Sequence, residues 1–404
     1  MEHEAFDVAV VGAGPVGLLA ALRLGQSGHR VCLVGPEPAR QDGRSAALFG
    51  PSVELLEQAG LWPALVTGAG PLRILRIVDD TGSLFRPPPV EFRADEIGLA
   101  AFGWNVGNAD LTAALATALR DQVGVTWIET AAAGFEDGDP AGVLLADGTI
   151  VAASLVVAAD GRRSVIRTSA GIGASERSYP QSAFTTVLSH ERDHGDVSTE
   201  FHTRGGPFTL VPLPGRRSSL VWVTSPHHAR RLAASEADIL ARAVEERSHA
   251  LLGAVEVAGP RGVVPLVAMR AQRLAAGRLV LVGEAAHVLP PIGAQGLNLG
   301  FADVAALLRA VESVTGGLST GDVERATGTY ARARALDIGA RTTLVDGLNR
   351  ALLSDLLPVD LARGLGLGLL GTVGPLRRSV MRLGFPGRSD AVSSRTAAVG
   401  SRRS

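Results

Sequence analysis

A strand, a glycine-rich turn and a helix near the start of the chain restrict its fold more than any other feature. The motif Gly12-Ala-Gly14-Pro-Val-Gly17 follows the short apolar strand Asp7–Val11 and precedes the helical pattern Leu18–Gln26. In a parallel α/β sheet, the first glycine of GxGxxG makes the tight turn and the second lets a dinucleotide pyrophosphate approach the backbone. The third lets helix and strand pack closely. The sequence therefore predicts a Rossmann-like, dinucleotide-binding domain.

The end of the second strand departs from this pattern. A carboxylate that binds ribose hydroxyls is expected there, but Gly35 occupies the position. If the chain turns at Gly35-Pro36, Glu37 is predicted to reach the ribose instead; the alternative is that Glu37 is solvated on a loop. Arg44 begins the loop that follows, where a cation can meet a cofactor phosphate or ribose.

Two further segments end a buried strand with residues suited to a ligand. The apolar run Leu155–Ala159 ends at Asp160-Gly161, which is where open α/β sheets bind their ligands. The apolar run Leu279–Val282 leads through Gly283-Glu284, two prolines and further glycines into a helix that starts near Asn298. The N–H groups at such a helix N-terminus attract negative charge, either a phosphate or an electron-rich ring that develops an anion.

The middle of the chain predicts a second domain. From 173 to 269 the sequence reads as strands with polar turns, and no helix is predicted before Ser235–Arg247. The predicted fold class is α/β: a Rossmann-like domain with an inserted, mostly antiparallel β-sheet domain and a C-terminal helical region. The predicted parts are the nucleotide domain at 1–172 and 270–345, with 72–102 assigned to either domain, the substrate domain at 173–269, C-terminal helices at 346–386 and a disordered tail at 387–404.

Composition excludes several kinds of protein. The net charge of -1 gives no overall basic field for nucleic acid. Cys32 is the one cysteine in the sequence, which rules out a disulfide framework, a dithiol redox pair and a cysteine metal site, and it fits a reducing cytoplasm. No leader pattern is recognised, and no apolar run approaches the roughly 18 residues of a spanning helix.

Taken together, the motifs Gly12–Gly17, Asp160-Gly161 with Arg167, and Gly283–Asn298 resemble those of single-component flavin monooxygenases of the para-hydroxybenzoate hydroxylase type. The resemblance covers nearly the whole chain. Within that family, Pro290–Gly300 is most similar to the ubiquinone-biosynthesis hydroxylases. The resemblance implies an aromatic hydroxylase that uses non-covalent FAD, NAD(P)H and O₂ through a flavin hydroperoxide, with a prenylated phenol of ubiquinone biosynthesis as its substrate.

The resemblance also implies roles for individual residues. Asp160 and Gly161 serve both FAD and the transient nicotinamide cofactor. Glu284, where the family usually has Asp, meets the ribitol, and Pro291 and Gly296 form the environment of the flavin ring. Together with the ribose prediction for Glu37, the cofactor-binding set is Gly12, Gly14, Gly17, Glu37, Arg44, Asp160, Gly161, Gly283, Glu284, Gly296, Leu297 and Asn298.

The sequence identifies fewer residues for the substrate pocket than for the cofactor site. A dry pocket protects the reacting flavin from water, and residues that could roof it are Tyr179, Phe208, Leu210, Pro212 and Trp222, each equally well explained as core. His287 is interpreted as a structural histidine that is satisfied by backbone groups rather than as a catalytic base. No feature of the sequence identifies a group that deprotonates the substrate.

The segment 348–383 is rich in leucine with interspersed arginines. This pattern is typical of a helix that lies in a membrane interface, so we expect a cytoplasmic protein with peripheral contact to the inner membrane. The alternative is that these leucines cover the nucleotide domain. The partner hypotheses are a quinone-biosynthesis complex and a homodimer. The alternative functions are a non-catalytic, flavoprotein-like scaffold or lipid-binding subunit of such a complex, and a flavin hydroxylase or epoxidase of secondary metabolism.

Overall fold

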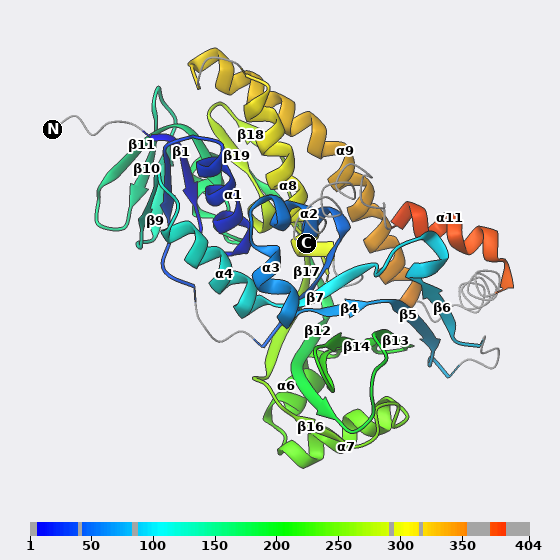
Figure 1. Cartoon of the computed structure of the whole chain (residues 1–404). Coiled ribbons are helices and arrows are strands. Elements are labelled where there is room, and N and C mark those ends of the chain that lie inside the picture. Colours follow the sequence, from blue (N-terminus) through cyan, green and yellow to red (C-terminus); the bar gives the residue numbers. More distant parts are fainter. Residues whose placement is uncertain are drawn as a thin grey trace, which may run out of the picture.

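The computed structural model describes residues 6–38, 43–82, 88–290, 295–314, 318–353 and 372–384. Pro291, the predicted tail at 387–404 and the larger part of 348–383 therefore lie outside the described residues. Figure 1 shows two bodies, a nucleotide domain that holds the N-terminal strand and a sheet domain below it.

A mainly parallel sheet forms the centre of the nucleotide domain, in the order β18-β19-β11-β1-β2-β8, and the hairpin β9-β10 extends from β11. Four neighbouring pairs on this path are parallel, from β19 through β11, β1 and β2 to β8. The bounds are β1 (Phe6–Val11), β2 (Val31–Val34), β8 (Val125–Ile128), β9 (Ala132–Glu136), β10 (Ala141–Leu145), β11 (Ile150–Ala158), β18 (Ala275–Ala276) and β19 (Leu279–Leu281). Strands β2 and β19 are buried along their whole length, as expected where helices cover both faces.

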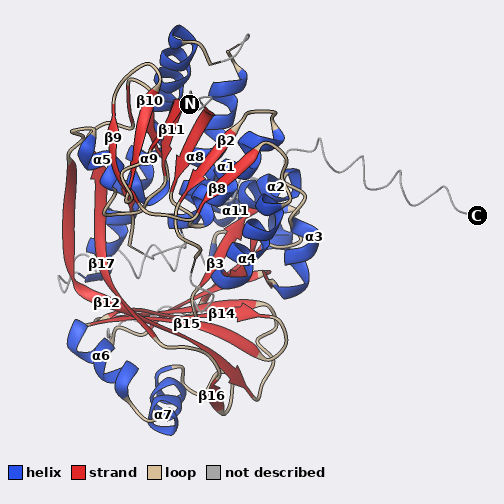
Figure 2. Ribbon diagram, turned by 90° about the vertical axis from the view of Figure 1, so that its left-hand side faces the viewer, coloured by secondary structure: helices blue, strands red, loops and turns tan. Residues whose placement is uncertain are grey.

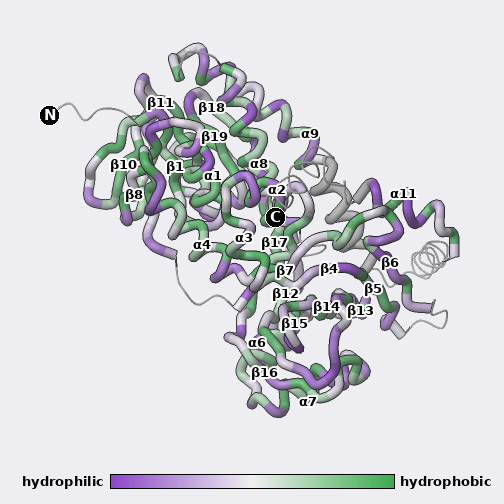
Figure 3. Tube along the Cα trace, viewed as in Figure 1, coloured by the Kyte–Doolittle hydropathy of each residue, from purple (hydrophilic) through white to green (hydrophobic). Residues whose placement is uncertain are grey.

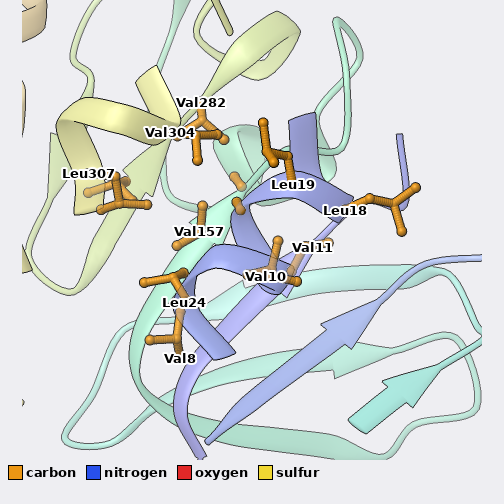
Figure 4. Packing of buried hydrophobic residues seen from close by; sticks show 14 of the residues in the cluster. Val8, Val10, Val11, Leu18, Leu19, Leu24, Val157, Val282, Val304 and Leu307 are labelled. Carbon is orange, nitrogen blue, oxygen red and sulfur yellow. The ribbon is translucent and has the colours of Figure 1, made fainter. Parts of the chain in front are cut away.

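Helices cover this sheet and complete the main core. They are α1 (Pro15–Gln26), α4 (Asn108–Arg120), α5 (Val165–Ser169), α8 (Gln295–Glu312) and α9 (Thr320–Leu353). Figure 4 shows part of the core, including Val10 of β1, Leu24 of α1 and Val304 of α8, which are at most 1% exposed. Figure 3 shows the hydrophobic residues gathered in the strands and in α8 of this domain. These layers confirm the predicted α/β class.

The second domain is a nine-stranded sheet, in the order β20-β17-β12-β15-β14-β13-β5-β6, with β16 beside β12. Its pairs are antiparallel except β13 with β5. The bounds are β5 (Ile74–Asp79), β6 (Val90–Arg93), β12 (Ala174–His190), β13 (Val197–Thr203), β14 (Gly206–Leu213), β15 (Arg217–Thr224), β16 (Val255–Val257), β17 (Gly262–Ala271) and β20 (His287–Val288). Strands β5 and β6 come from 72–102, so this part of the chain joins the substrate sheet.

Smaller elements join the two domains. A three-stranded sheet, in the order β3-β7-β4, lies between them (Figure 1). The remaining bounds are β3 (Ser45–Phe49), β4 (Gly70–Leu72), β7 (Gly103–Gly107), α2 (Gly50–Gln58), α3 (Trp62–Leu65), α6 (Pro226–Ala234), α7 (Ala237–Arg247), α11 (Gly374–Gly384), and the 3-10 turns η1 (Val66–Gly68), η2 (Ala94–Ile97) and η3 (Gly283–Ala285).

The nine-stranded sheet has two covered faces. Figure 2 shows α6 and α7 below it and the nucleotide domain above it. Phe208, Leu210 and Trp222 pack in one cluster with Leu232 of α6 and Leu240 of α7. We call the side of the sheet that α6 and α7 cover the outer face. Phe208, Leu210 and Trp222 are therefore core residues on the side away from the nucleotide domain, and the interpretation of them as a roof over the flavin is wrong.

The inner face is the opposite side of this sheet, and it is defined by the cross-strand neighbours Thr185, Val221, Thr209 and Glu200. Successive side chains of a strand point to opposite faces, so these residues alternate with the outer-face aromatics. Among the expected roof residues, Tyr179 packs with Val221 in a separate cluster. At these positions, threonine, valine, tyrosine and glutamate side chains face the nucleotide domain.

Candidate active site

The three glycines of the first motif meet different surroundings. At Gly12, where φ is +112°, a Cβ would lie 2.4 Å from Ala159 O, and at Gly17 it would lie 1.9 Å from Gly12 O. The fold itself therefore requires both glycines. At Gly14, which lies at the N-cap of α1, a Cβ would meet nothing within 4 Å in the part of the chain that the structure describes. The space in front of the α1 N-terminus is open, which fits the approach of a pyrophosphate.

The structure explains why no carboxylate ends β2. A Cβ at Gly35 would lie 2.8 Å from Ala13 N, so a side chain there would collide with the glycine-rich loop. Glu37 is half-exposed and its Oε1 lies 3.3 Å from an Arg120 guanidinium nitrogen. Arg120 also contacts Glu129 at 3.0 Å. Glu37 is thus held near the end of β2 by Arg120, and its contact to the ribose stays a prediction. Arg44, in the loop beyond, is exposed.

The second motif offers a carboxylate oxygen. Asp160 Oδ2 accepts a hydrogen bond from Ile166 N at 3.2 Å, whereas Oδ1 is buried without a partner among the described residues. Beside it, Gly161 has φ +82° and open space at its Cβ position. An unpaired buried oxygen is costly unless a ligand donates to it. Asp160 and Gly161 therefore fit the predicted cofactor contact.

Arg167 ties the second motif to the third. The residue is 8% exposed, and its guanidinium group donates to Ala285 O and to Arg162 O, both at 2.9 Å. Ala285 belongs to η3, which is more than one hundred residues away in the sequence. The sequence assigned no contact to Arg167; its spacing after Asp160 was the available signal.

The third motif turns sharply at Gly283, where φ is +58°. Glu284 follows it with an exposed side chain, as a ligand contact from this position needs. At the N-terminus of α8, a Cβ on Gly296 would meet no atom of the described residues within 4 Å. Because the first N–H groups of a helix lack intrahelical acceptors, the Gly296–Leu297 backbone can donate to a ligand there.

The side chain of Asn298 serves the protein rather than a ligand. Its Oδ1 accepts from Phe49 N at 3.0 Å and from Ser52 Oγ at 2.7 Å, and its Nδ2 donates to Ala47 O at 2.7 Å. These contacts hold β3 and α2 against α8. With its side chain engaged in this way, Asn298 is expected to meet a ligand through its backbone, and this contact stays a prediction.

A buried ionic group underlies the third motif. The Asp303 carboxylate is fully buried and accepts hydrogen bonds from Gly283 N at 2.8 Å and from Arg334 Nε at 2.7 Å. His287 Nε2 lies 2.6 Å from the same carboxylate. Asp337 contacts the other side of the guanidinium. We call Asp303, His287 and Arg334 the buried triad; it fixes η3 to α8 and α9.

The triad corrects one expectation and adds residues that were missed. His287 has a structural role as interpreted, but its partner is a carboxylate rather than a backbone group. Its Nδ1 has no partner among the described residues. Asp303 and Arg334 received no role from the sequence, although a single acid among the apolar residues of a helix and an arginine in a long helix were visible signals.

Burial changes the titration of the groups near the triad. Burial, and then the negative charge of Asp303, raise the pKa of the Tyr330 hydroxyl well above its usual value. Tyr330 therefore remains a neutral donor to Leu281 O, at 2.6 Å. Burial alone would lower the pKa of Arg334, but Asp303 and Asp337 reverse this and keep the pKa above its usual value.

Comparison with known proteins gives one family and a consistent set of relatives. A family model described as an FAD binding domain matches residues 5–338. The chain is 36% identical to "Ubiquinone hydroxylase UbiL" of Rhodospirillum rubrum over 385 residues, which cover 93% of this chain and 88% of that protein. It is 30% identical to "3-demethoxyubiquinol 3-hydroxylase" of Escherichia coli over 392 residues, which cover 95% and 99%.

Solved structures share the fold at lower identity. The p-nitrophenol 4-monooxygenase PnpA from Pseudomonas putida matches with a TM-score of 0.75 at 20% identity, covering 95% of this chain and 99% of that one. Klebsiella pneumoniae HpxO, complexed with FAD and uric acid, matches with a TM-score of 0.74 at 21% identity, covering 94% and 97%.

Proposed function

The chain belongs to the FAD binding domain family, and we propose that it is an FAD-dependent monooxygenase that hydroxylates the aromatic ring of a ubiquinone precursor with NAD(P)H and O₂. The 36% identity to a ubiquinone hydroxylase over 93% of the chain is the observation that carries this proposal. Bound FAD would supply hydride acceptance and oxygen activation at the junction of the two domains.

The chain's own residues would hold and orient the cofactor. The open space at Gly14 would take the pyrophosphate against the N-terminus of α1, and Asp160 would accept a hydrogen bond through its unpaired Oδ1. Glu284 would meet the ribitol. The N-terminus of α8 at Gly296 would stabilise negative charge on the ring, because the helix dipole and N–H groups favour an anion there. The inner face of the substrate sheet would keep water away.

Turnover should respond to the substrate. We expect NAD(P)H oxidation to be slow with the protein alone and faster when a phenol with a short prenyl chain is added. Following NAD(P)H absorbance together with product and hydrogen peroxide checks this. Peroxide without product would mean that the wrong ring was offered. Absence of hydride transfer with every phenol tried would instead favour the non-catalytic scaffold.

We propose further that the substrate is a prenylated phenol that the enzyme meets at an anionic membrane surface. Val373, Leu376 and Val380 are 40%, 43% and 45% exposed on or beside α11, and Arg378 and Arg382 are interspersed with them. Arg377 donates to Glu96 Oε2 at 2.8 Å and fastens α11 to η2. Within the described ranges, no helix is long and apolar enough to cross a membrane.

Vesicle binding tests the α11 surface. Leu376→Asp should lower binding to phosphatidylglycerol vesicles by about tenfold, since burying a leucine contributes roughly 1.5–3 kcal/mol, and salt should weaken the wild-type binding. Leu336→Asp is the matched control, because Leu336 is 83% exposed on α9. Equal flotation of both variants would mean that α11 does not bind lipid.

A further inference from the structure

Gln181 is a buried polar residue whose hydrogen bonds the fold satisfies only in part. It is 5% exposed and belongs to β12 of the substrate sheet. Its Nε2 donates to Gly205 O at 2.8 Å. Its Oε1 is buried and, among the residues that the structure describes, has no donor. A buried amide oxygen without a donor costs free energy, so a ligand that brings an N–H or O–H group to it would be stabilised there.

The contact with Gly205 fixes which end of the Gln181 amide is the unpaired one. The oxygen and the nitrogen of a glutamine are told apart by their hydrogen bonds. A flipped amide would place Oε1 against the carbonyl oxygen of Gly205, and neither of these atoms can donate. The nitrogen is also closely surrounded: a Cβ at Gly206, where φ is +129°, would lie 3.0 Å from Gln181 Nε2 and 2.7 Å from Val223 Cγ1. The side chain is therefore held at its nitrogen and presents its oxygen.

Gln181 lies on the inner face of the sheet. The Val223 side chain lies beside the Gln181 amide, and it packs with Tyr179 and Ala183 in a cluster separate from the outer-face core. Val223 is two residues from Val221 on β15, so both point to the same side, and Val221 defines the inner face. The carboxamide is therefore on the side that faces the nucleotide domain (Figure 2).

A β-bulge bends β12 at this place. The register of β12 against β17 shifts between Ser178 and Ser182, so that three residues of β12, 179–181, lie opposite Leu266 alone. Bulges bend a strand and change the direction of its side chains, and they are frequent next to active sites. Figure 2 shows β12 and β17 continuing from the sheet toward the nucleotide domain. Gln181 therefore lies where the two domains join.

The third motif meets the same pair of strands. Met269 of β17 pairs with Val288 of β20, two residues before Pro290. Met269 is three residues from Leu266, which is roughly 10 Å along a strand. The flavin ring is predicted to lie beside the turn and helix that follow Pro290. The unpaired oxygen of Gln181 is thus on the face of the sheet, and beside the strand, that lead to the predicted flavin ring.

We propose that Gln181 binds the substrate and selects its substituents, because Oε1 accepts a hydrogen bond from a hydroxyl group on the aromatic ring. A hydroxyl group donates, whereas the same oxygen after methylation only accepts and leaves Oε1 unpaired. The residue therefore favours a ring with a free hydroxyl over its methyl ether. No proton is transferred, because a carboxamide is not a base at neutral pH. This inference rests on the proposed hydroxylase function and assigns one residue to its substrate.

Equilibrium dialysis of the flavin-loaded protein at pH 7, without NAD(P)H, tests this role. The two probes, 2-prenylphenol and 2-prenylanisole, differ by one methyl group, and the phenol keeps its proton because it ionises near pH 10, at about the value of tyrosine. The wild type should bind the phenol about tenfold or more tightly than the ether, since the ether leaves a buried acceptor unpaired. Equal affinities would overturn the inference and mean that a buried water donates to Gln181.

Gln181→Met removes the acceptor and keeps a side chain of similar length. This variant should bind the phenol and the ether with equal affinity. Gln58→Met is the matched control, because Gln58 is exposed on α2, and it should keep the wild-type preference. A preference that persists in Gln181→Met would contradict the proposed role. Flavin content and the midpoint of urea unfolding are measured alongside, because methionine leaves Gly205 O without its donor.

Gln181→Asn decides the question if Gln181→Met fails to fold. Asparagine keeps the carboxamide but is one methylene shorter, so it cannot both donate to Gly205 and reach the ligand. It should therefore lose most of the preference for the phenol, and an unchanged preference would count against the role of Gln181.

The proposed function and the role of Gln181 fail in different ways. If the hydroxyl preference depends on Gln181 but no phenol supports NAD(P)H oxidation, the hydroxylase function fails and the binding role of Gln181 stands. If a phenol is hydroxylated but Gln181→Met keeps the wild-type preference, the binding role fails and the hydroxylase function stands.

Discussion

Replacing Asp303 by alanine should lower the free energy of unfolding by about 3–5 kcal/mol, the usual cost of removing one partner from a buried ion pair. The change leaves the Arg334 guanidinium buried without its main counter-charge and removes the acceptor of Gly283 N. Urea unfolding of the protein without flavin measures this loss directly. The midpoint should move while the slope stays the same.

Asp337→Ala is the matched control for this prediction. Asp337 contacts the same guanidinium, but its side chain is 34% exposed, so the loss should be about 1 kcal/mol or less. Equal losses in the two variants would show that Arg334 is stabilised by its total negative surroundings and not by the contact with Asp303.

Gly14→Val should abolish flavin binding and leave the protein folded. The added side chain enters the space in front of α1 where the pyrophosphate is predicted to lie; among the described residues, nothing comes within 4 Å of the Cβ position. We expect colourless protein after purification, with the circular dichroism and unfolding midpoint of the flavin-free wild type. The loss in FAD affinity should exceed 10³-fold, or about 4 kcal/mol.

Gly17→Ala provides the contrast at the same motif. Its Cβ would lie 1.9 Å from Gly12 O, so this smaller change should destabilise the fold itself. A Gly14→Val protein that retains full flavin would show that the N-terminal loop is not the phosphate site.

The nucleotide domain could be predicted from sequence because its strands are buried on both faces. Continuous apolar runs such as Val31–Val34 and Leu279–Leu281 predict strands that are buried on both faces, and the spacing of the glycines predicts the turns beside them. The helix α6 was missed although Ser225-Pro226 is a helix start signal, and Ser225 Oγ indeed accepts from His228 N. Because α6 has nine residues, its helical periodicity is too short to be recognised beside the strand patterns that precede it.

The substrate sheet could not be oriented in this way. Both of its faces are covered, by α6 and α7 on one side and by the nucleotide domain on the other, so buried residues occur on both faces and do not tell one face from the other. The sequence therefore left open whether Phe208 and Trp222 belong to the core or to a roof over the flavin, and the structure places them in the core. The buried triad could not be assembled from sequence for another reason: Asp303 and Arg334 are 31 residues apart, and only the packing of α9 on α8 brings them together.

Arg167 joins the second motif to the turn at Ala285, so the cofactor site can form only after both segments have been synthesised. Strand β19 adds to β11 only after residues 159–278 have been translated. Until then, the end of β11 at 156–158 has an open edge on that side, beyond the part that β10 covers. The turn that Arg167 holds lies at 283–285, and the arginine that neutralises Asp303 lies at 334. More than one hundred residues must therefore be synthesised before this sheet is complete, and we expect flavin to bind only after that.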